Sequence, residues 1–224
     1  MAKRPVPARQ EQRQQTRARL VDAALRVFAE QGYDHATVEE ISIAAGYSKG
    51  AYYFHFDSKE DILLELLSTW IDDQTKRLLA FETARGPAAI ALLETLESLL
   101  RYDDRDPCWR LILPEIWVQS HRNAKVRETL QSGYARWIDL LRDAFEKAER
   151  EGLVSLAIRA DIAASLVLAA HDGLTLRSRL KTQAEGALPS SQVLGALVTL
   201  VAPSEQASKP QIPPALRRTA RRKK

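Results

Sequence analysis

The chain has 224 residues, enough for one large domain or two small ones, and its 45% hydrophobic and 28% charged content is typical of a globular protein with a sizeable core. A single cysteine excludes an intrachain disulfide, no apolar run approaches the ~20 residues of a membrane-spanning helix, and the arginine-rich N-terminus lacks a signal peptide, so we expect a cytoplasmic protein with no membrane partner. The net charge of +4 divides into +5 over residues 1–19, −7 over 20–202 and +6 over 203–224, which favours a polyanionic partner, although basic ends are also common in solvated tails.

The first predicted helix follows a basic arm. Residues 1–12 are predicted to be disordered, and residues 13–31 form a helix that Gly32 ends. The apolar residues that mark one face of this helix are Leu20, Ala24, Val27 and Phe28.

Two short helices follow. Thr37 and Glu40 have the spacing of a capping box, in which the threonine hydroxyl accepts from a backbone N–H and the glutamate reaches back. The helix that they begin ends in an Ala-Ala-Gly turn at residues 44–46. Ser48 can cap a second short helix that runs to about His55. A short capped helix, a tight turn and a second short helix are typical of a helix-turn-helix, whose second helix enters the major groove of DNA.

The rest of the chain also has helical periodicity. We expect further helices at residues 58–81, 87–101, 107–121 (kinked at Pro114), 123–150, 161–183 and 189–202. No segment alternates with the period of a strand, and residues 203–224 are predicted to form a disordered basic tail. The predicted fold class is therefore all-α with about nine helices: a three-helix DNA-binding domain at 13–57 and a helical-bundle domain at 58–202, to which the family resemblance described next assigns effector binding and dimerisation.

The sequence ATVEEISIAAGYSKGAYYFHFDSKEDI at residues 36–62 resembles the signature of the tetracycline-repressor (TetR-type) family of homodimeric, ligand-responsive transcription regulators. The stretch 110–180, which includes Asp172-Gly173-Leu174, is similar to the effector and dimer domain of the branch that contains the choline-responsive regulators.

The resemblance implies which residues contact DNA. It assigns phosphate contacts to Thr37, Tyr53, His55 and Lys59. It assigns the reading of base edges to Lys49, Tyr52 and Phe54, with Ser48 and Gly50 at the DNA surface. Tyr47 and Tyr52 depart from the smaller or aliphatic residues that are common at these positions, so both are candidates for altering operator choice. The alternatives are that His55 is a simple helix-end residue and that Tyr52 and Phe54 pack internally.

Aromatic and polar residues recur at helical spacing in the second domain. Eight of them, together with Leu113, could line an effector cavity, or could be ordinary core: Trp70, Gln74, Trp109, Leu113, Trp117, His121, Tyr134, Trp137 and His171. By the resemblance, helices 161–183 and 189–202 pair with those of a second subunit.

These observations predict a homodimeric regulator, a repressor by the resemblance, that a small molecule releases from a palindromic double-stranded DNA operator. A constitutive DNA-binding regulator without an effector is the alternative. Neither catalytic residues nor a cofactor or metal is predicted, because the four histidines lack metal-ligand spacing and no phosphate-binding glycine loop occurs. A thiol sensor acting through Cys108 is a further alternative.

Overall fold

The computed structural model describes residues 8–83, 107–152, 154–178 and Ala196, and within them every element is a helix. The helices are α1 (Ala8–Gln31), α2 (Val38–Ala44), α3 (Lys49–Tyr53), α4 (Lys59–Thr83), α6 (Pro107–Arg122), α7 (Ala124–Arg150) and α8 (Ala160–Ser178). The all-α prediction is confirmed for this part of the chain. The predicted helices at 87–101 and 189–202, most of the basic arm and the tail at 203–224 lie outside the described residues, as does the count of nine.

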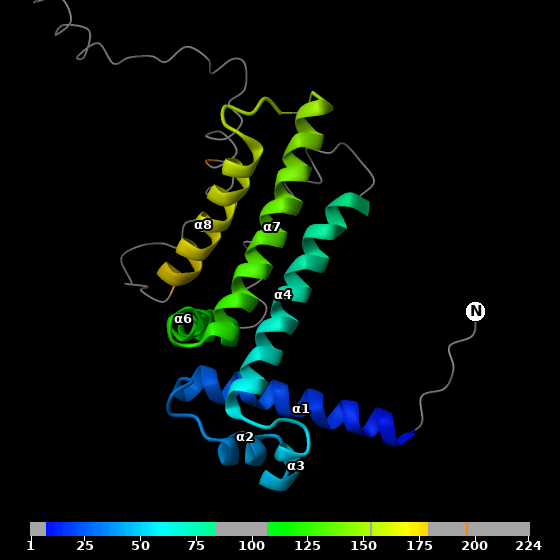
Figure 1. The fold of residues 1–224 in the computed structure, drawn as a ribbon, viewed down its shortest axis with the longest axis vertical. Helices are drawn as coiled ribbons and strands as arrows, with labels where there is room; N and C mark the ends of the chain where they lie inside the picture. The colour runs from blue at the N-terminus through cyan, green and yellow to red at the C-terminus, as the bar shows by residue number, and fades with distance from the viewer. Residues whose placement is uncertain (1–7, 84–106, 153, 179–195, 197–224) are drawn as a thin grey trace, which may run out of the picture.

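The helices form two groups (Figure 1). In one group α4, α7 and α8 lie side by side, and α6 lies at the beginning of α7 and packs against α1. In the other, α1 crosses the beginning of α4, and α2 and α3 lie beneath α1 in this view. The N-terminal end of α1 extends past α4.

The start of α1 corrects the sequence analysis. The helix begins at Ala8, so residues 8–12, predicted as part of a disordered arm, are helical. This segment consists of good helix formers, and Glu11 places a carboxylate in the first turn, where it interacts favourably with the helix dipole.

The predicted caps are confirmed. Thr37 accepts from the backbone N–H of Glu40 at 3.2 Å, and the Glu40 carboxylate accepts from that of Thr37 at 2.9 Å. Ser48 and Ser58 accept from the N–H groups three residues on, which begins α3 and α4 at the predicted places. Gly32 ends α1 with a φ of +83°, a conformation that residues with a Cβ rarely adopt.

A continuous core connects the two groups of helices. The buried residues run from Phe28, Ile41 and Phe56 in the N-terminal group to Trp70 and Trp137 among the long helices. Helices α4 and α7 approach closely at Gly133, where an added Cβ would lie 2.8 Å from Ile71. Helix α6 continues through Pro114.

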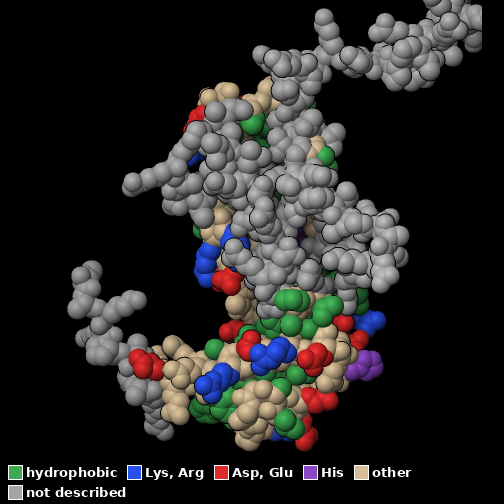
Figure 2. All heavy atoms as spheres, turned by 180° about the vertical axis from the view of Figure 1, so that it is seen from behind, with side chains coloured by type: hydrophobic (Ala, Val, Ile, Leu, Met, Phe, Trp, Pro, Cys, Tyr) green, Lys and Arg blue, Asp and Glu red, His purple; other side chains and the backbone are tan. Residues whose placement is uncertain are grey.

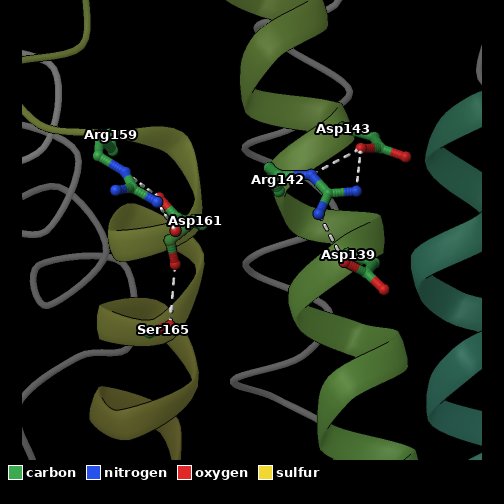
Figure 3. Close-up of polar contacts among 6 residues, drawn as sticks. All are labelled: Asp139, Arg142, Asp143, Arg159, Asp161 and Ser165. Atoms are coloured by element: carbon green, nitrogen blue, oxygen red, sulfur yellow. Dashed lines mark hydrogen bonds and ion pairs between the residues drawn. The ribbon is translucent and has the colours of Figure 1, made fainter.

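The outer surface carries charges of both signs, and on the face seen in Figure 2 basic and acidic side chains alternate over the lower part of the described chain. On α7, Arg142 binds Asp139 and Asp143, and at the start of α8 Arg159 binds Asp161 (Figure 3). The hydrogen bond from Arg159 lowers the pKa of Asp161. Exposed pairs of this kind contribute little to stability.

Candidate nucleic-acid interface

Helix α3 presents a mixed basic and aromatic face to solvent. Ser48 caps it, and Lys49 and Gly50 at its beginning are exposed. Tyr53 is 48% exposed, and Phe54, which follows the helix, is 66% exposed. Large aromatic side chains are usually buried in a folded domain, so the exposure of these two makes the face a candidate binding surface.

Tyr52 does not belong to this face, and its predicted role in reading base edges is wrong. Its side chain is fully buried, its ring packs 5.6 Å from that of Phe56, and its hydroxyl donates to the Ser58 carbonyl at 2.9 Å. Burial raises the pKa of this phenol well above its usual range.

The side chain of Lys59 makes hydrogen bonds within the protein. Its ammonium donates to the carbonyls of Tyr33, Asp34 and Ala36 at 2.6, 3.3 and 2.9 Å, which uses all three of its hydrogens. Desolvation by burial lowers the pKa of this lysine. In this conformation the Lys59 side chain, which was predicted to contact a phosphate, holds the α1–α2 connection, residues 32–36.

The same connection is held from the other side by α6. Glu115 accepts from the backbone N–H of Tyr33, Gln119 donates to the Asp34 carboxylate at 2.9 Å, and Arg122 lies 3.7 Å from it. These α6 residues lie on one helical face. Sequence reasoning missed them, because residues more than 80 positions apart give no local signal.

The other predicted DNA contacts lie at or near the surface. Thr37 is exposed at the start of α2. Tyr47 is half-buried against α1, where hydrogen bonds with Thr16 and Arg19 lower the pKa of its phenol. His55 is also half-buried, and burial, followed by the nearby Arg13 and Arg17, lowers the pKa of its imidazole.

Five of the nine predicted effector residues form a chain of contacting aromatic rings. Trp109 stacks on Trp70 at 5.9 Å, Trp70 meets Trp137 at 5.1 Å, and the chain continues through Tyr134 to Trp117 at 5.1 and 5.6 Å. Trp70 and Trp109 also border a cleft of about 430 Å³ between α1, α4 and α6.

The other predicted effector residues differ in their surroundings. Leu113 is buried in the core, and His121 is exposed on α6. Gln74 is buried, and neither its carboxamide atoms nor the indole nitrogen of Trp70 has a hydrogen-bond partner among the described residues. His171 is buried on α8.

Asp172 is a polar residue that the site prediction omitted. Its carboxylate accepts from the Tyr134 hydroxyl at 2.8 Å and lies 3.3 Å from Nδ1 of His171. The sequence put Asp172 beside His171, but only the packing of α7 against α8 brings Tyr134 to it.

Groups of residues that could hold a metal ion are absent from the described segments, and none of the helices in these segments is apolar over a length that would cross a bilayer.

Two family models match the chain. Residues 20–66 match bacterial regulatory proteins of the tetR family, and residues 88–202, more than half of the chain, match the C-terminal part of BetI-type transcriptional repressors. The chain belongs to the tetR family. It is a transcriptional regulator of this type.

Relatives of this tetR-family regulator include repressors and ligand complexes. It is 24% identical over 192 residues to the HTH-type transcriptional repressor DhaR of Mycobacterium sp. (strain GP1), covering 85% of this chain and 94% of the repressor. A transcriptional regulator from Saccharomonospora viridis in complex with choline superposes with a TM-score of 0.73 at 24% identity, over 85% of this chain and 100% of that one. FadR from Bacillus subtilis in complex with stearoyl-CoA gives 0.70 at 20% identity, over 82% and 98%. The two solved structures show that the fold is shared.

Proposed function

We propose that this regulator binds a palindromic double-stranded DNA operator as a homodimer, and that a small molecule bound among its C-terminal helices releases it, as expected of a repressor. The proposal treats α1, α2 and α3 as a helix-turn-helix reading head that ends at residue 57, and residues 58–202 as the effector and dimer domain. The exposed face of α3 carries the proposal, because it combines a lysine and a glycine at the start of a short capped helix with two aromatic rings at its end.

Within this head, each exposed residue has a role that its chemistry supports. Lys49 can donate to guanine O6 and N7, and the Phe54 ring can pack on a thymine methyl group. Gly50 and Ser48 let the backbone lie close to the duplex. Thr37, Tyr53 and His55 are the proposed phosphate contacts, and Tyr47 lies beside them.

A stripe on α8 supports the homodimer. Ile162 and Leu166 are each 46% exposed and Leu176 is 55% exposed. With the exposed Ala169 and Gly173, they recur at alternating spacings of four and three residues, the pattern of a helix that packs against another helix along its length. A second copy of α8 is the partner that we propose for this stripe.

The case for an effector rests on the relatives and on the ring cluster. Structures of two regulators with this fold contain choline and stearoyl-CoA, so proteins of this fold bind different ligands. In this chain, polar atoms of Trp70 and Gln74 that have no partner among the described residues lie buried beside stacked rings, and a ligand could satisfy them. Helix α4 runs from these residues to the reading head, so we propose that ligand binding shifts the spacing of the two heads through α4. The close ring packing favours the second candidate, a constitutive regulator whose interior is already filled.

Selection of bound duplexes from a random pool tests the DNA-binding part. We expect enrichment of a palindrome whose half-sites are at least one helical turn apart. Titration of the selected duplex with and without candidate ligands then separates the two candidates. A lack of enrichment in the full-length protein would exclude operator binding, and an affinity that no ligand changes would favour the constitutive regulator.

A further inference from the structure

A groove of about 930 Å³ lies between the N-terminal half of α1 and helix α3. It is open to solvent, and side chains of both helices form its walls. Its lining includes Arg13, Thr16 and Arg17 from α1, and Tyr47, Phe54 and His55 from the flanks of α3. We call it the α1–α3 groove.

The charges in the groove favour an anion. The residues that line it include two guanidinium groups and an imidazole but no carboxylate. Burial lowers the pKa of His55, and the positive charges of Arg13 and Arg17 lower it further. The remaining polar groups on the walls are the amides of Gln10, Gln12 and Gln14 and the hydroxyls of Thr16 and Tyr47, which can bind phosphate and sugar oxygens.

Arg13 is the arginine whose charge is available. Arg17 is already engaged, because it pairs with Glu65 at 3.1 Å and donates to the His55 carbonyl at 2.9 Å. The Arg13 guanidinium lies 5.0 Å from the centre of the Phe54 ring and has no carboxylate partner among the described residues. Stacking on the ring holds the guanidinium in place while its N–H groups stay open to a ligand.

The location of the groove beside α3 favours DNA rather than a small anion as its ligand. Phe54 belongs both to the groove and to the exposed end of α3, so a duplex that lies against α3 extends over the groove. An open channel with cationic and amide walls fits the backbone of a polymer.

We propose that the α1–α3 groove seats the phosphodiester backbone that flanks the bases facing α3, with Arg13 as its cationic contact. The inference rests on the proposed DNA-binding function and extends it to α1. Arg13 lies outside residues 20–66, which match the family model, and outside the segment that resembles the family signature.

The charge of Arg13 is tested by Arg13→Gln, with Arg26→Gln as the matched control. Both arginines are on α1, and Arg26 pairs with Asp22 outside the groove. Binding of the full-length protein to the selected operator and to a scrambled duplex is measured by fluorescence anisotropy from 50 to 300 mM KCl. We expect Arg13→Gln to weaken binding to both duplexes roughly tenfold at low salt, and to reduce the salt slope by about 0.9 for each phosphate that it leaves without a cationic partner. Arg26→Gln should leave the affinity for both duplexes and the salt slope unchanged.

A second variant separates charge from packing. Arg13→Lys keeps the charge, so its salt slope should equal that of the wild type. An unchanged slope in Arg13→Gln, or an equal loss of slope in both Arg13 variants, would overturn the proposal, as would a loss confined to the operator, since backbone contacts carry no sequence information. Melting curves establish that each variant is folded. If the wild-type protein binds neither duplex, the proposed function fails before the variants are compared.

Discussion

Replacing Lys59 by Met should destabilise the fold and leave the salt dependence of DNA binding unchanged. The methionine keeps most of the aliphatic stem and removes the ammonium that joins the start of α4 to the carbonyls of Tyr33, Asp34 and Ala36. Of these residues, Ala36 is buried, so its carbonyl is the least able to find water instead.

The magnitude follows from the three hydrogen bonds. A bond from a charged donor contributes about 1.5–3 kcal/mol, but the Lys59 side chain is only half-buried and water can replace part of this stabilisation, so we expect a total loss of about 2 kcal/mol. For a chain of this size, this lowers the midpoint of thermal unfolding by roughly 4–8 °C.

Thermal unfolding and hydrogen exchange measure the effect. Amides of the α1–α2 connection should exchange faster in Lys59→Met than in the wild type. Lys76→Met is the control, because Lys76 is also on α4 but pairs with Asp73 on an exposed face. Unfolding and exchange like those of the wild type, together with a smaller salt slope for DNA, would refute the structural role and restore the phosphate contact.

Three further substitutions test other parts of the molecule. Thr37→Ala should cost about 1 kcal/mol in a urea melt. Because hydrogen bonds from Thr37 lower the pKa of Glu40, the part of the cap that the Glu40 carboxylate makes contributes at neutral pH and is lost as the pH falls through the titration of Glu40. The difference between the two proteins should therefore shrink in acid, although the bond from the Glu40 N–H to the Thr37 hydroxyl remains. Tyr52→Phe should lower the free energy of unfolding by about 1 kcal/mol, because it removes the hydrogen bond to Ser58, and should leave operator affinity unchanged. A variant that is as stable as the wild type but binds the operator more weakly would place Tyr52 at the DNA surface. Leu166→Glu should turn the dimer into a monomer in analytical ultracentrifugation, and a variant that stays dimeric would exclude the α8 stripe as the interface.

The sequence predicted the helices well because their ends are local events. Thr37, Ser48 and Ser58 each cap a helix through a residue three positions away, so short-range patterns contain the information. Side-chain direction at Tyr52 was missed for a different reason. The resemblance supplied a role for the position, whereas the inward turn of the residue depends on how α3 packs.

Contacts between distant segments could not be predicted. The pairing of Glu115 with Tyr33 and the meeting of Arg13 with Phe54 join segments with no shared periodicity. The nine predicted effector residues show the same limit: five of them are rings that do meet, but helical spacing alone did not distinguish those from the exposed His121.

The way in which the α1–α2 connection is held bears on the construction of chimeric regulators. The simplest chimera joins the helices α1–α3 of one regulator to the C-terminal domain of another at a junction near residue 57. That junction leaves Asp34 and Tyr33 on one parent and their partners Lys59, Gln119 and Glu115 on the other. A working graft must therefore transfer these partners along with the head, and compatibility between two parents can be judged from the residues at these positions before any gene is built.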